Sequence, residues 1–126
     1  MVKEFRNGKE KALFCAEVAR EKKALRPVLL ELKGLSTVTD YFLICSGRSD
    51  RQVQAIAREI EEKMAERGER PLGIEGMAEG RWVLLDYDDL VIHIFQEPVR
   101  EYYDLEGLWV DAPRVPLPEG HGEEGD

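Results

Sequence analysis

Two short stretches of the chain contain residue types whose spacing could support phosphate or nucleotide chemistry. The first, Ser46-Gly47-Arg48-Ser49-Asp50, leads from an apolar run into an amphipathic one, and free amides at a helix N-terminus can bind an anion. It has one glycine and neither the P-loop nor the dinucleotide-binding spacing. We therefore interpret this turn as a helix cap, and we keep a nucleotide-binding or nucleotidyl-transferring enzyme as the alternative.

The second stretch is acidic and contains Asp86, Asp88 and Asp89. A nucleotidyltransferase needs paired carboxylates aimed at Mg²⁺, but Asp88 and Asp89 separate two apolar runs, where aspartate is common because it bonds to local amides. His93 has no serine, cysteine or second histidine near it in the sequence, so we interpret it as a hydrogen-bonded structural residue rather than a general base. The sequence thus predicts no catalytic residue, no cofactor and no metal site.

Composition predicts one soluble, cytoplasmic domain. The chain has 126 residues, of which 43% are hydrophobic, enough for a single core. No apolar run approaches the roughly 20 residues that span a bilayer, and the N-terminus lacks the apolar segment of a signal peptide. Cys15 and Cys45 belong to no CxxC or Cys/His cluster, so we expect buried free thiols.

The net charge of the chain is −8, which disfavours direct contact with nucleic acid because phosphate backbones repel an acidic surface. Basic residues near the N-terminus alternate with glutamates and form no basic run. The same charge suits a basic protein partner, although solubility alone explains it equally well.

The order of apolar patterns predicts an α/β fold, a mixed five-stranded sheet flanked by helices in a single domain. A helix is expected over 9–25, stopped by Pro27, and another begins at a capping box formed by Ser49 and Gln52. A last helix starts at Pro98 and buries Val99, Tyr102 or Tyr103, and Leu105. Strands are expected over 28–32, 41–45, 72–75, 82–87 and 90–95. The domain spans 1–111, and a mobile tail rich in proline, glycine and acids spans 112–126.

Trp82 is the strongest candidate for a partner contact. Its spacing from Leu84 and Asp86 puts an aromatic, an aliphatic and an acidic side chain on one face of a strand. Large aromatic residues beside polar groups are typical hot spots of protein interfaces. From the residues alone, packing in the core is the stronger interpretation, because tryptophan also buries a large area inside domains.

A resemblance to a known family changes this balance. Four stretches carry the resemblance: 34–52 (GLSTVTDYFLICSGRSDRQ), 73–76 (GIEG), 82–87 (WVLLDY) and 99–106 (VREYYDLE). Together they resemble the ribosomal silencing factor, or Iojap-like, family over roughly 11–116. The resemblance implies a nucleotidyltransferase-like arrangement of the sheet.

The family resemblance also implies a function without catalysis. Such proteins bind the large ribosomal subunit through large-subunit ribosomal protein fourteen, block joining of the small subunit and lower translation when nutrients are limiting. Trp82 corresponds to the family's hairpin tryptophan, and Glu75, Glu79 and Asp86 would complement a basic ribosomal surface. Leu84 and Tyr87 complete the expected partner-binding set. A homodimer formed through a sheet edge or the last helix is a further alternative.

Overall fold

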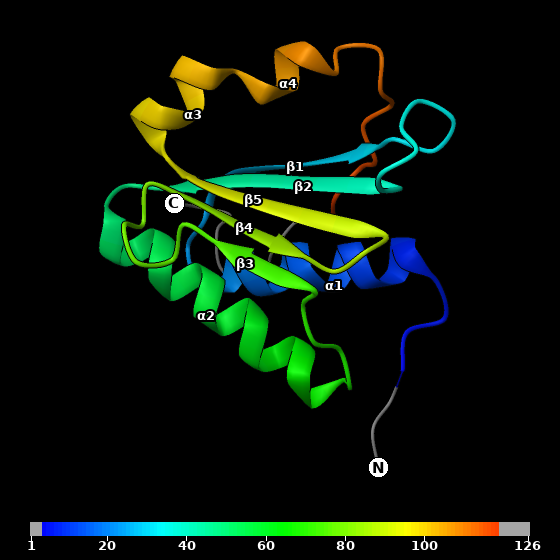
Figure 1. The fold of residues 1–126 in the computed structure, drawn as a ribbon, viewed down its shortest axis with the longest axis horizontal. Helices are drawn as coiled ribbons and strands as arrows, with labels where there is room; N and C mark the ends of the chain where they lie inside the picture. The colour runs from blue at the N-terminus through cyan, green and yellow to red at the C-terminus, as the bar shows by residue number, and fades with distance from the viewer. Residues whose placement is uncertain (1–3, 119–126) are drawn as a thin grey trace.

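The sheet lies between two layers of helices in the computed structural model, which describes residues 4–118 (Figure 1). One face is covered by α1 (Gly8–Glu21) and α2 (Asp50–Glu66), and the other carries α3 (Glu97–Tyr103) and α4 (Leu105–Leu108). The strands are β1 (Leu25–Glu31), β2 (Tyr41–Gly47), β3 (Gly73–Glu75), β4 (Trp82–Asp86) and β5 (Leu90–Gln96). The predicted fold class, a single α/β domain with a mixed five-stranded sheet, is confirmed.

The strand order is β1-β2-β5-β4-β3. The two central strands, β2 and β5, pair in parallel, and every other neighbouring pair is antiparallel. Both central strands are apolar on two sides, as expected for strands covered by helices on both faces. β4 and β5 form the predicted hairpin, in which Tyr87 donates its amide to the carbonyl of Leu90 across the turn.

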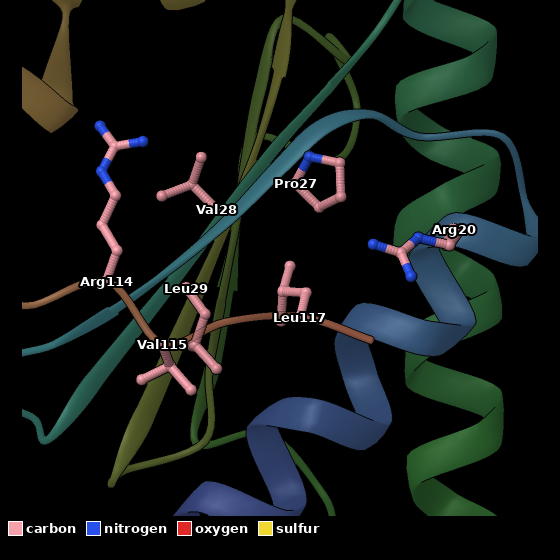
Figure 2. Close-up of a pocket in the computed structure, with 7 residues that line it drawn as sticks. All are labelled: Arg20, Pro27, Val28, Leu29, Arg114, Val115 and Leu117. Atoms are coloured by element: carbon pink, nitrogen blue, oxygen red, sulfur yellow. The ribbon is translucent and has the colours of Figure 1, made fainter. Parts of the chain in front are cut away.

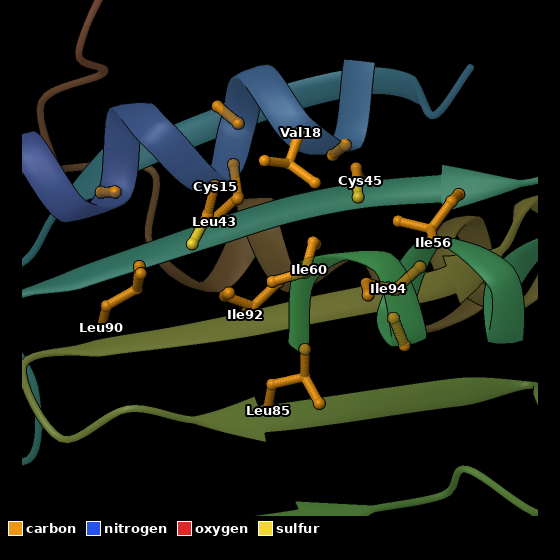
Figure 3. Packing of buried hydrophobic residues seen from close by; sticks show 14 of the residues in the cluster. Cys15, Val18, Leu43, Cys45, Ile56, Ile60, Leu85, Leu90, Ile92 and Ile94 are labelled. Carbon is orange, nitrogen blue, oxygen red and sulfur yellow. The ribbon is translucent and has the colours of Figure 1, made fainter. Parts of the chain in front are cut away.

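The larger core lies between the sheet and the α1–α2 layer (Figure 3). The apolar residues of α2 repeat at helical spacing, which places all of them on one buried face. They meet the side chains of Leu43, Leu85 and Ile92, which the strands direct toward the same layer. Cys15 and Cys45 lie within this core as buried free thiols, so that prediction is confirmed.

The first helix is shorter than its apolar pattern predicted. It ends at Glu21, and the chain turns through Lys23, whose φ of 66° lies in the left-handed region. Pro27 therefore does not stop a helix but lies within β1. A proline is tolerated there because β1 has only one strand neighbour and its register shifts between Leu25 and Val28.

The cap of α2 differs from the prediction in one bond. Ser49 Oγ accepts from the amide of Gln52, as expected, but Gln52 Oε1 accepts from the amide of Arg48 rather than from that of Ser49. Gly68 follows the helix with a φ of 82°, consistent with its predicted left-handed position.

The last helix presents a different face from the one predicted. It starts one residue before Pro98, and its buried residues are Val99 and Arg100. Tyr102 is 82% exposed and Tyr103 is 51% exposed, so the prediction that one of them is buried is wrong. Arg100 takes the inward position because its guanidinium donates to the carbonyls of β1 and to Glu106 Oε2, which satisfies a buried charge.

The described part of the predicted tail, 112–118, packs against the sheet. Arg114 bridges to Leu30, and Val115 donates its amide to the carbonyl of Leu29. A pocket of about 200 Å³ lies along this seam and is lined by residues of β1, by Arg20 and by residues of the segment 114–117 (Figure 2). Residues 112–118 therefore make contacts with the sheet that the predicted mobile tail did not include, and the remainder of the predicted tail lies outside the described residues.

Candidate partner-binding surface

The candidate surface lies on the sheet face that carries α3 and α4. Side chains from neighbouring strands form cross-sheet rows on this face, and the register pairs Trp82 with Phe95, and Leu84 with His93. The helices pack over the β1, β2 and β5 side, where Ile44 and Phe95 are fully buried. Trp82 and Leu84 on β4 remain partly exposed. The β4 side of this face is therefore accessible to a partner.

Five aromatic side chains, counting the imidazole, form a continuous chain of ring contacts on this face, which we call the aromatic row: Tyr103, Trp82, His93, Phe42 and Trp109. Its consecutive ring centroids are 4.9, 6.0, 4.6 and 6.0 Å apart. Trp82 also packs on Phe95, with a centroid separation of 4.8 Å. Such contacts hold large side chains in fixed positions, so the row presents a rigid aromatic surface.

His93 is the most buried polar member of the aromatic row, with 4% of its surface exposed. Its Nδ1 accepts a hydrogen bond from Trp82 Nε1 at 3.1 Å. Burial lowers the pKa of His93 to about 4, so the imidazole is neutral at pH 7 and its proton resides on Nε2. The side chain thus has the structural role that the sequence predicted, and its hydrogen-bond donor is the candidate Trp82.

The predicted contact residues on β4 and β3 are brought together. Trp82, Leu84 and Asp86 alternate with buried residues and share one face, as predicted. Glu75 pairs with Leu84 across the two strands and is exposed, which places a carboxylate beside the apolar side chain. Glu79 is exposed in the loop that precedes β4.

Tyr87 does not belong to this surface. It is 2% exposed and packs in the core beneath α1 and α2, where burial raises the pKa of its hydroxyl. Residues one apart in a strand point to opposite faces, so Tyr87 lies on the far side from Asp86. The prediction of Tyr87 as a contact residue is therefore corrected.

The polar groups of the turn at 46–50 are occupied by the protein's own side chains. Ser46 is fully buried, and its hydroxyl accepts from Arg100 Nη1 at 3.1 Å and donates to Glu97 Oε2. The amide of Gln52, in the first turn of α2, bonds to Ser49 Oγ, and the amide of Arg48, just before the helix, bonds to Gln52 Oε1. Because these donors are used and Glu97 places a carboxylate beside Ser46, the turn is poorly suited to phosphate.

The acidic stretch is likewise used internally. Asp86 Oδ1 accepts from the amide of Asp88, which shapes the hairpin turn. Asp89 forms an ion pair of 2.7 Å with Lys11, whose ammonium also lies 3.1 Å from Glu69. Within residues 4–118 there is no group of three or more histidine, cysteine or acidic side chains that could hold a metal ion.

Phe42 and Tyr103 are surface candidates that sequence reasoning missed. The alternation of β2 could have placed Phe42 on the same face as Ile44. No local pattern could have placed Tyr103 against Trp82, because that contact depends on how α3 docks on the sheet.

Among the described helices, none is long and apolar enough to cross a membrane.

Comparison with known proteins identifies close relatives over most of the chain. The family described as "Ribosomal silencing factor during starvation" matches residues 6–125. The ribosomal silencing factor RsfS of Bacillus subtilis is 47% identical over 111 residues, covering 88% of this chain and 94% of the relative. That of Halalkalibacterium halodurans is 48% identical over 97 residues, covering 77% of this chain and 83% of the relative. A crystal structure of a Bacillus halodurans protein superimposes with a TM-score of 0.78 at 42% identity, covering 87% of this chain and 100% of that one.

Proposed function

This chain belongs to the ribosomal silencing factor family, and from that membership we propose that it represses translation by binding the large ribosomal subunit. The contact is made with large-subunit ribosomal protein fourteen, and the bound protein blocks joining of the small subunit. This action lowers translation when nutrients are limiting. It needs no catalysis, because an occupied interface is sufficient to exclude a second subunit.

The observation that carries this proposal beyond family membership is the accessible apolar area formed by part of the aromatic row together with Leu84. Trp82 and Leu84 supply apolar area that is partly open to solvent, and Tyr103 extends it from α3. Interface hot spots are enriched in tryptophan and tyrosine. A ribosomal protein that covers this area gains the binding energy of rigid aromatic anchors without reorganising the fold.

Acidic side chains at the edge of this surface favour a basic partner. Glu75 lies opposite Leu84 on the neighbouring strand, and Asp86 follows on the same face of β4. Charge complementarity of this kind speeds encounter with a basic surface and disfavours direct contact with phosphate. The partner is accordingly a basic protein surface rather than ribosomal RNA.

Sedimentation with separated ribosomal subunits tests the proposal. The purified protein should co-sediment with the large subunit and not with the small one. Addition of the small subunit to this complex should give fewer joined ribosomes than in the absence of the protein. If joined ribosomes form at undiminished yield while the protein stays bound, the block of subunit joining is wrong.

Substitution of Trp82 localises the contact. Trp82→Ala should weaken binding about 30-fold, since loss of an aromatic hot spot costs about 2 kcal/mol or more. Its circular dichroism and thermal unfolding must first show that the fold is retained, because Trp82 also packs on Phe95. Normal affinity of the folded variant would exclude the aromatic row as the contact site.

Charge reversal tests the acidic edge of the surface, and the same change at a distant position serves as the matched control. Glu75→Lys should reduce affinity several-fold at low salt, and the effect should shrink as ionic strength rises. Glu62→Lys makes the same change on an exposed position of α2, which covers the opposite face of the sheet. Equal losses in the two variants would mean that only net charge matters and that the contact is elsewhere.

A further inference from the structure

We propose that His93 is a positioning residue, whose imidazole fixes the indole ring of Trp82 in the orientation that a partner binds. This inference rests on the proposed function, because it concerns the same surface. It assigns a specific role to a buried side chain that makes no direct contact with a partner.

The indole ring of Trp82 is held by two kinds of contact. The rings of Phe95 and Tyr103 pack against it at tilts of 32° and 47°, with centroid separations of 4.8 and 4.9 Å, and limit the space that the indole can occupy. Ring packing alone leaves the terminal torsion of an aromatic side chain broad. The 3.1 Å bond from Trp82 Nε1 to His93 Nδ1 selects one of the orientations that packing permits.

The surroundings of His93 suit this role. Its ring packs edge-on against Phe42 with centroids 4.6 Å apart, and its cross-strand neighbours are Ile44 and Leu84. This apolar packing keeps the imidazole neutral, so Nδ1 retains the lone pair that accepts from the indole. A carboxylate in the same position would accept as well but would leave a buried charge.

A fixed indole binds more tightly because less side-chain freedom is lost on association. Removal of the hydrogen bond should therefore reduce affinity for the large subunit about fivefold, the scale of one neutral hydrogen bond. The loss should occur only when residue 82 can donate to His93. This condition separates positioning of Trp82 from general support of the fold.

A double-substitution cycle tests the condition. His93→Leu should weaken binding about fivefold in the wild-type background and have no further effect when combined with Trp82→Phe, which lacks the N–H donor. His93→Gln should restore part of the affinity, because its amide oxygen can accept. Equal losses from His93→Leu in both backgrounds would overturn the inference and leave the proposed function intact.

Nuclear magnetic resonance of the unmodified protein provides a test that needs no partner and no variant that must fold. With ¹⁵N labelling, His93 should show the tautomer protonated on Nε2, and a scalar coupling should join Trp82 Nε1 to His93 Nδ1. The two indole signals are assigned in the unmodified protein by correlating each side chain with its own backbone. A tautomer protonated on Nδ1 would overturn the inference. Failure of the wild-type protein to bind large subunits would instead overturn the proposed function, and this inference with it.

Discussion

The burial of His93 makes the stability of the protein dependent on pH between about pH 4 and 6.5. The ordinary pKa of 6.5 falls to about 4 in the folded protein because burial disfavours the charged form. Below pH 6.5 the unfolded chain therefore takes up a proton that the folded protein does not. Stability from this group is complete above pH 6.5 and is lost as the pH falls toward 4.

The size of the effect follows from these two values. A pH of 5 lies about 1.5 units below the pKa of 6.5 that the histidine has in the unfolded chain, whereas the histidine of the folded protein is still mostly neutral at this pH. Each unit corresponds to about 1.4 kcal/mol, so the free energy of unfolding should drop by about 2 kcal/mol between pH 7 and pH 5. Glu97 and Glu106 also have lowered pKa values, but from a starting value of 4.5, so their contribution is lost mainly below pH 5.

Urea denaturation followed by circular dichroism at pH 7 and pH 5 measures this drop. The wild-type protein should lose about 2 kcal/mol, and His93→Gln should lose less than about 0.5 kcal/mol over the same interval. His121→Gln, which replaces the other histidine of the chain, separates the contribution of that residue. A loss in His93→Gln as large as in the wild type would refute the assignment of the pH dependence to His93.

Two further predictions concern positions outside the aromatic row. In urea denaturation, Gly76→Ala should destabilise the protein by at least about 2 kcal/mol more than Gly34→Ala. Both glycines have a φ of 81°, so the backbone strain of a new side chain is the same at the two sites. A Cβ at Gly76 would also lie 2.0 Å from the carbonyl oxygen of Trp82, whereas a Cβ at Gly34 would have no surrounding atom within 4 Å. Comparable losses would show that the backbone near Trp82 yields easily. Cys15 and Cys45 should not react with a thiol reagent at pH 8 until the protein unfolds, because both thiols are buried. Burial also raises their pKa values, that of Cys45 to about 12, so little reactive thiolate is present. Rapid labelling of the native protein would contradict this prediction.

The elements that sequence reasoning placed correctly are those with a strong periodic pattern. The buried face of α2 follows helical spacing without interruption, and β2 and β5 are short apolar runs bounded by polar residues. Such patterns depend only on which side chains avoid water. The alternation of β4 similarly predicted that Trp82, Leu84 and Asp86 share one face.

The errors occurred where distant contacts override the local pattern. Pro27 was expected to stop a helix, but β1 accommodates it where the register with β2 shifts. Arg100 was absent from the residues expected to be buried by the last helix, and arginine is usually exposed. Its burial depends on backbone carbonyls of β1, which lie far away in sequence. The spacing of residues within α3 therefore could not predict it.

The buried network around Ser46 links the turn that resembled an anion site to the proposed contact surface. Arg100 joins Ser46 to the carbonyls of Leu25 and Arg26, and Glu97 accepts from the same serine. These bonds anchor α3 against the ends of β1 and β2.

Because Tyr103 lies on α3, the anchored helix brings its ring within 4.9 Å of the Trp82 ring. A phosphate bound at the Ser46 hydroxyl would compete with the Glu97 carboxylate for that hydroxyl, and with Ser46 and Glu106 for the guanidinium of Arg100. Such binding would weaken the bonds that anchor α3, and the existing hydrogen bonds of the folded protein therefore favour the intact aromatic row.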